Sequence, residues 1–217
     1  MKKLITKIRS LNRKQKTTVV LALIFVMGIL ALMVLYSSRS NKTESEIVTY
    51  STDEPSEERP GDDYKWKGEA KDPKKIKIPS IGVDAFIQKV GVDQKKEVAV
   101  PNNLFMVGWF VDTVRPGEKG LSLIDGHVSG RRNDGIFKDL EKFKEGDEYS
   151  VELGDGTTIN YKVIGKQSAP VNDSVGIMFS QNPKVSNQLN LVTCSGKYDE
   201  KTRSYTERLT VMSEQIQ

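Results

Sequence analysis

Short apolar runs separated by turn residues fill the chain from about residue 70 to residue 217. Ile76-Lys77-Ile78 alternates between apolar and polar and stops at Pro79, and a second run extends from Ala85 to Val92. Further apolar runs cover residues 121–124, 189–193 and 209–212. Many short strands punctuated by turn signals are typical of a β-barrel or β-sandwich.

The most specific local signal is a hairpin. Residues 149–153 alternate, lead into Gly154-Asp155-Gly156, and are followed by a second alternating run at 158–164. Glycine and aspartate between two alternating runs favour a tight turn between antiparallel strands. Helical spacing appears only at 134–143, through Ile136, Phe137, Leu140 and Phe143. We therefore predict a mainly β fold with one or two short helices.

The first 36 residues have the pattern of a membrane anchor. Residues 1–16 carry seven basic residues and no acid, and residues 17–36 are uncharged and rich in large apolar side chains. A helix of twenty residues spans about 30 Å, the thickness of a bilayer core. The span is longer than a signal-peptide core and lacks a clear Ala-x-Ala cleavage site. We predict a basic cytoplasmic tail (1–16), an uncleaved transmembrane signal anchor (17–36) and an extracellular remainder, as in a single-pass protein of the cell membrane.

Charge and composition divide the remainder in two. Residues 37–69 are acidic, contain Pro55 and Pro60, and have few large apolar side chains, which predicts a flexible linker. Residues 70–217 are numerous enough for one domain with its own core. Nine of the 33 basic residues lie in 1–43 without any acid, so the remaining 24 basic and 29 acidic residues give a net charge of −5. The basic tail therefore explains the overall +4, and no nucleic-acid partner is expected.

The chain contains one cysteine, Cys194, and one histidine, His127. A single cysteine excludes an intramolecular disulfide, and in an exported domain it indicates a reactive thiol or an intermolecular bridge. Each of the two residues follows an apolar run, where a strand is expected to end and a loop to begin. The alternative is a buried cysteine acting as a small apolar residue and an ordinary loop histidine.

Metal and phosphate sites are not expected. The glycines at 126, 130 and 135 lack the following Lys-Ser/Thr of a phosphate-binding loop, and one histidine with one cysteine cannot supply a usual zinc set. Asp125, Asp134 and Asp139 match no calcium loop and are interpreted as solvated surface. We predict no metal and no cofactor.

Several motifs together resemble the sortase family. Leu191-Val192-Thr193-Cys194 resembles the Thr-Leu-x-Thr-Cys signature, with Asn190 in place of the leading threonine, and Asp125-Gly126-His127 resembles the Gly-His motif. Arg208-Leu209-Thr210-Val211 resembles the arginine-bearing last strand, and residues 75–85 resemble the first strand and turn. The run 107–110 followed by 115–117 is more similar to class F and class D/E-like members than to class A. The resemblance covers residues 72–214 in the family's order.

The resemblance implies a closed eight-stranded β-barrel and a membrane-anchored cysteine transpeptidase. Such an enzyme cleaves a C-terminal sorting signal, often Leu-Pro-x-Thr-Gly, of a surface protein and joins it to an amine of a cell-wall precursor or a pilin. Cys194 is then the nucleophile and His127 the proton carrier, and Arg208 donates to the oxyanion or the substrate backbone. Arg203 is the alternative cation, nine residues after Cys194, but it lies in a polar loop.

Substrate specificity is expected in residues 167–188, before the cysteine strand. We expect the sorting signal to contact Val175, Ile177 and Met178 there, and Thr193 beside the nucleophile. Simple packing of that loop against the core is the alternative.

Two rival functions remain on sequence alone. An L,D-transpeptidase or another extracellular cysteine peptidase also uses cysteine and histidine, although the Ser-x-Gly-Cys pattern of the former is absent. A tethered, non-catalytic β-barrel binding module predicts no chemical role for Cys194.

Overall fold

The computed structural model describes residues 17, 24–33, 46–52 and 54–217, in two compact units divided between Thr43 and Glu44. Residues 24–33 are helical. Across the described residues, none of the helices combines the length and apolar character needed to cross a membrane. The predicted tail at 1–16 and residues 18–23 and 34–36 of the predicted span lie outside the described residues. The membrane anchor therefore stays a prediction.

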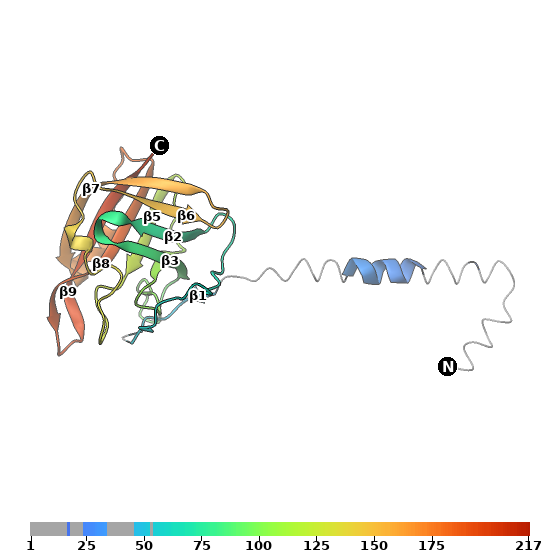
Figure 1. The fold of residues 1–217 in the computed structure, drawn as a ribbon, viewed down its shortest axis with the longest axis horizontal. Helices are drawn as coiled ribbons and strands as arrows, with labels where there is room; N and C mark the ends of the chain where they lie inside the picture. The colour runs from blue at the N-terminus through green and yellow to red at the C-terminus, as the bar shows by residue number, and fades with distance from the viewer. Residues whose placement is uncertain (1–16, 18–23, 34–45, 53) are drawn as a thin grey trace. The chain divides into compact units, whose positions relative to one another are not determined.

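Eight strands close into a barrel (Figure 1). They are β2 (Pro73–Ile78), β3 (Val83–Val90), β4 (Val107–Phe110), β5 (Gly120–Gly126), β6 (Glu148–Leu153), β7 (Thr158–Pro170), β8 (Asn187–Asp199) and β9 (Ser204–Ile216). Their order is β3-β2-β6-β7-β9-β8-β5-β4, and the parallel pairing of β4 with β3 completes the circle. The predicted mainly β architecture and the closed eight-stranded barrel are confirmed.

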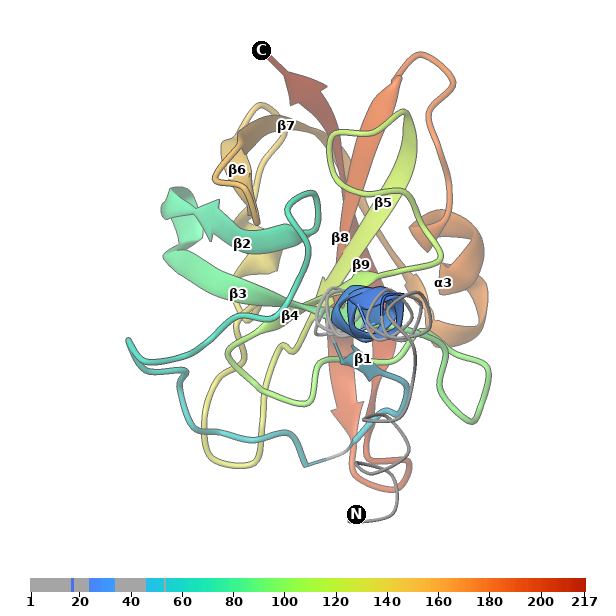
Figure 2. The same cartoon turned by 90° about the vertical axis from the view of Figure 1, so that its right-hand side faces the viewer.

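The helices differ from the sequence prediction. The spacing at 134–143 yields only a 3-10 turn, η2 (Leu140–Lys142), and a second 3-10 turn, η1 (Pro79–Ile81), follows β2. Phe137, Leu140 and Phe143 are fully buried in the barrel core, so their spacing reports burial without a long helix. The α-helix α3 (Val171–Met178) lies within the segment expected to be a pocket loop. It contacts β7 and β9 on the outside of the barrel (Figure 2).

The strands separate two apolar clusters. Leu191 lies in the main cluster inside the barrel, whereas Val192 lies in a second cluster with Leu123 and Phe110. Because successive residues of a strand face opposite sides, the second cluster lies on the outer face of β4, β5 and β8. Cys194 shares the face of Val192, and Asp125 shares the face of Leu123.

Part of the predicted flexible linker is packed on the barrel. The short strand β1 (Ile47–Val48) pairs in parallel with β3, and Val48 is buried in the outer cluster. Further on, the Trp66 indole donates to the Ile87 carbonyl at 3.0 Å. The sequence prediction of a linker up to residue 69 therefore fails for this stretch, because a few anchoring side chains and backbone bonds offset its low apolar content.

Candidate active site

Cys194 and Arg208 are brought together by the antiparallel pairing of β8 with β9. They are direct register partners, as are Val192 and Thr210 two residues earlier. Opposite residues of an antiparallel pair have neighbouring side chains on one face. The strand β8 continues past Cys194 to Asp199, with a register shift between Ser195 and Tyr198. Cys194 thus lies inside a long hairpin, rather than at the strand end that the sequence predicted.

His127 follows directly after β5, as predicted. The parallel register of β5 with β8 runs to the pair Asp125–Val192, and the Thr193 hydroxyl donates to the Gly126 carbonyl at 2.7 Å. His127 and Cys194 are the next residues along these neighbouring strands. Two of the three predicted catalytic residues therefore lie on the adjacent strands β8 and β9, and the third directly follows their neighbour β5.

One ring nitrogen of His127 has a defined partner. Nε2 lies 2.7 Å from the Pro101 carbonyl. A carbonyl only accepts hydrogen bonds, so Nε2 carries the hydrogen and Nδ1 is left to exchange a proton. Burial lowers the pKa of His127, and the bond to Pro101 opposes this shift. The neutral imidazole is consequently favoured in the resting site.

The thiol of Cys194 is half-buried. Burial raises its pKa above the ordinary value, the charge of Arg208 lowers it, and Asp125 raises it. The net shift is upward, which favours the neutral thiol, as the lowered pKa of His127 favours the neutral imidazole. The thiolate is the reactive form, and Arg208 is the group that favours it.

Arg208 retains free donors. Its Nη1 donates to the carbonyls of Glu207 at 3.1 Å and Tyr205 at 3.4 Å. Within the described residues it forms no ion pair. A guanidinium has five N–H donors, and those of Nε and Nη2 have no acceptor in the part of the chain that the structure describes, so they can serve an oxyanion or a substrate carbonyl. Arg203, by contrast, is exposed at the turn of the β8–β9 hairpin, with φ 54°.

Asp125 is the residue whose role the sequence missed. It is buried, its Oδ1 has no hydrogen-bond partner among the described residues, and burial raises its pKa well above the ordinary value. The interpretation as solvated surface is wrong for this residue. Asp134 and Asp139 do not join it, because they pair with Lys138 and Lys142. No group of three metal-binding side chains occurs in the described part of the chain.

The predicted substrate-binding residues divide into two groups. Thr193 is buried and bonded to Gly126, so its side chain positions the β5 end rather than lying on the surface. The other three lie on α3, which begins two residues after Ala169, the register partner of Arg208. Val175 is exposed, Ile177 is half-buried, and Met178 packs against the outer cluster.

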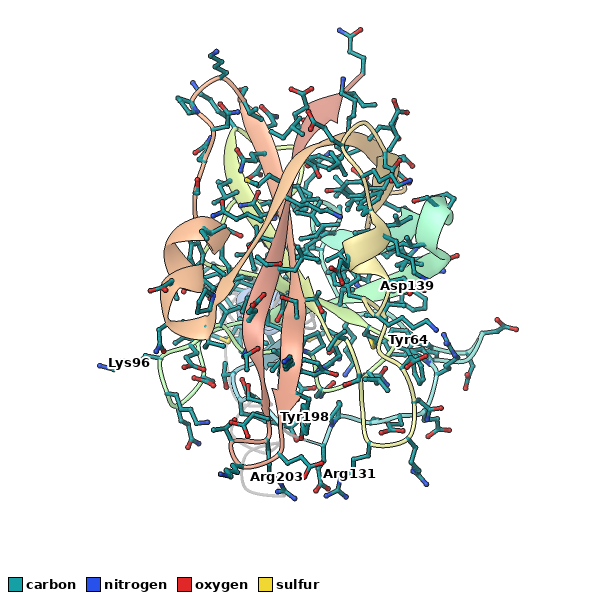
Figure 3. All side chains as sticks on the ribbon, turned by 90° about the vertical axis from the view of Figure 1, so that its left-hand side faces the viewer. Tyr64, Lys96, Arg131, Asp139, Tyr198 and Arg203 are labelled. Carbon is teal, nitrogen blue, oxygen red and sulfur yellow. The ribbon has the colours of Figure 1, made fainter. Side chains whose placement is uncertain are left out.

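The loop after His127 and the hairpin after Cys194 reach the same end of the barrel. The Ser129 and Tyr205 hydroxyls lie 2.8 Å apart and link the two. Figure 3 shows Arg131, Tyr198 and Arg203 together at this end. The site is therefore framed by two polar loops that contact each other.

Comparison with known proteins identifies the same region. The sequence model described as "Sortase domain" matches residues 76–216. The fold is similar to sortase C1 from Streptococcus agalactiae, at 23% identity and a TM-score of 0.51, covering 66% of this chain and 67% of that one. It is also similar to a lid mutant of sortase A from Corynebacterium diphtheriae, at 23% identity and 0.53, covering 70% and 73%.

A third similar structure is described as a Clostridium perfringens sortase D5 transpeptidase. It is 25% identical, with a TM-score of 0.50, and the match covers 67% of this chain and 79% of that one. A comparison with curated protein sequences finds no match.

Proposed function

The chain belongs to the sortase family of cysteine transpeptidases, and we propose that it cleaves a C-terminal Leu-Pro-x-Thr-Gly-like sorting signal and transfers the protein to an amine. The observation that supports this proposal is that Cys194 is paired with Arg208 and that His127 directly follows the adjoining strand β5. The similarity of 107–117 to class F and class D/E-like members stays a prediction, because the similar structures include sortases A, C and D.

In the first half-reaction the Cys194 thiol gives its proton to His127, and the resulting thiolate attacks the carbonyl carbon of the scissile peptide. Negative charge develops on the carbonyl oxygen, where the free N–H groups of Arg208 stabilise it. The carbon–nitrogen bond then breaks, and the protonated His127 gives its proton to the leaving amine. The product is a thioester on Cys194.

In the second half-reaction an acceptor amine attacks the thioester carbonyl and loses a proton to His127. The carbon–sulfur bond breaks, and the thiolate of Cys194 is regenerated. We propose a cell-wall precursor or a pilin lysine as the acceptor and a surface protein as the donor. The predicted anchor at 17–36 would hold the enzyme at the membrane, where both would be presented.

Product analysis tests this function. The full-length chain is incubated with a library of sorting-signal peptides and an amine acceptor, and products are identified by mass spectrometry. We expect cleavage at one bond and a product joined to the acceptor. Hydrolysis of many unrelated bonds without transfer would favour a cysteine peptidase, and inertness towards all peptides would favour a binding module.

The pH dependence follows from the two opposed pKa shifts. Between the lowered pKa of His127 and the raised pKa of Cys194, the neutral pair dominates and the reactive thiolate–imidazolium pair is a small constant fraction. We therefore expect kcat/KM to form a plateau. Below the lower pKa both groups are protonated, and above the higher pKa both are deprotonated. In either case the thiolate–imidazolium pair disappears, so kcat/KM falls. Initial rates between about pH 5 and pH 10 measure this, and a continuous rise into alkaline pH would show that no acid is needed.

Replacing Asp125 with asparagine tests the buried carboxyl. When ionised, Asp125 opposes the thiolate and raises the pKa of Cys194. We expect Asp125→Asn to lower that pKa and move the alkaline limb of the profile to lower pH. The rate of Cys194 alkylation by iodoacetamide against pH measures the shift. Asp134→Asn is the matched control, since Asp134 is exposed and paired with Lys138; equal profiles for both variants would contradict the assignment.

A further inference from the structure

Ser56 and Glu57 contact the two segments that surround His127, although they precede the region matched by the sortase model. We call these two residues the brace. The Ser56 N–H donates to the Asn102 carbonyl at 2.9 Å, and the Leu104 N–H donates to the Ser56 carbonyl at 2.8 Å. The brace thereby fixes residues 102–104, which directly follow Pro101, the acceptor of the His127 ring.

On its other side the brace holds the loop after His127. The Glu57 carboxylate accepts from the N–H of Arg131 at 2.6 Å and of Arg132 at 3.1 Å, and from the Asn133 amide at 2.7 Å. Its side chain is only 10% exposed. Although burial opposes its charge, the hydrogen bonds from Asn133, Arg132 and Arg131 keep the pKa of Glu57 below its ordinary value. One carboxylate thus satisfies three donors of one loop, and charged acceptors form the stronger bonds.

The loop passes this restraint to His127 through short contacts. The Gly135 N–H donates to the Val128 carbonyl at 2.9 Å, and the Phe137 N–H donates to the His127 carbonyl at 2.9 Å. A Cβ atom on Gly135 would lie 2.2 Å from the His127 carbonyl oxygen, and one on Gly130 would lie 2.6 Å from a Glu57 carboxylate oxygen. The Glu57 carboxylate, the loop and the His127 backbone are therefore in close contact, with no room for a side chain between them.

We propose that Glu57 is a positioning residue of the transpeptidase reaction, which holds the loop after His127 so that the imidazole keeps its bond to Pro101 and its place beside Cys194. This inference rests on the proposed function. Without the carboxylate, the loop N–H groups lose their acceptor and the loop can open. A displacement of about 1 Å in a catalytic group can cost about 10²-fold in rate.

Because His127 is the only histidine in the chain, its imidazole gives a single set of NMR signals. We expect the wild-type full-length chain to show mainly the Nε2–H tautomer when neutral and a pKa below 6.5. In Glu57→Ala both tautomers should be populated and the pKa should move towards 6.5. The kcat/KM for peptide transfer should fall at least about tenfold. Alkylation of Cys194 by iodoacetamide, which needs no proton carrier, should stay within about twofold.

Glu58→Ala is the matched control. It removes the same charge from the adjacent residue, and the exposed Glu58 side chain makes no hydrogen bond or ion pair with any described residue. It should leave all three measurements unchanged. If Glu57→Ala does not fold, Glu57→Gln replaces it, because the isosteric amide keeps one acceptor oxygen but turns donors towards Asn133 or the loop N–H groups; its effects should have the same sign.

Unchanged NMR signals and kcat/KM in the Glu57 variant would overturn the proposal. So would an equal loss in Glu58→Ala, which would indicate a general charge effect. The NMR measurement tests the link from Glu57 to His127 without any need for activity. If no variant and not even the wild type transfers peptide, that result counts against the proposed function, and the NMR signals still decide the role of Glu57.

Discussion

Cys194→Ala is expected to abolish both cleavage of the sorting-signal peptide and transfer to the amine, by at least about 10⁴-fold in kcat. No other cysteine exists in the chain to form the thioester. The fold should survive, because removing one half-buried sulfur atom loses few packing contacts and alanine fits the extended backbone of β8. Intact-mass spectrometry after mixing with peptide measures the acyl-enzyme, and release of the leaving amine measures cleavage.

The adjacent residue provides the control. Ser195 carries a hydroxyl nucleophile, and its Oγ is buried without a hydrogen-bond partner among the residues that the structure describes. Ser195→Ala should therefore acylate at close to the wild-type rate and gain the same mass on Cys194. A Cys194→Ala variant that still released the amine, or a Ser195→Ala variant that lost the acyl-enzyme, would move the nucleophile away from Cys194.

The barrel could be predicted from the sequence where the pattern is local. The hairpin of β6 and β7 was found from alternation around Gly154-Asp155-Gly156. The motifs that resemble the sortase family identify Cys194 and Arg208 separately, but they do not predict that the two residues are paired. Their pairing depends on where the β8–β9 hairpin turns, and the register of these strands places them opposite each other. The helix α3 was missed because it is short and contains two valines and a glycine, which have modest helix propensity.

The brace and Asp125 could not be predicted for a different reason. Composition shows that residues 37–69 have little apolar surface to bury, but it does not show that Glu57 meets the N–H groups of a loop more than 70 residues away. A carboxylate is also expected on the surface, whereas Asp125 is covered in the outer cluster region. The hydrogen bonds of Glu57 and the burial of Asp125 both depend on tertiary packing, which local sequence patterns do not report.

Arg208→Ala is expected to slow acylation of Cys194 by about 10²–10³-fold, which is the usual effect of removing one oxyanion donor. Two effects contribute, because the charge of Arg208 lowers the pKa of Cys194 and its free N–H groups face the same side of the hairpin as the thiol. Arg208→Lys separates them. Lysine keeps the charge, so alkylation of Cys194 by iodoacetamide should stay near wild type. It cannot reproduce the planar fork, so acylation by peptide should remain poor.

Arg203→Ala is the control for the loss of a cation near the site. Arg203 lies at the exposed turn of the same hairpin, and an exposed charge usually contributes little, so its acylation rate should stay close to wild type. The measurement is single-turnover acylation followed by mass spectrometry, since charge first develops on the substrate oxygen in that step. If Arg203→Ala were the slower variant, the oxyanion would be stabilised from the hairpin turn, and the pairing of Arg208 with Cys194 would serve only to hold β8 against β9.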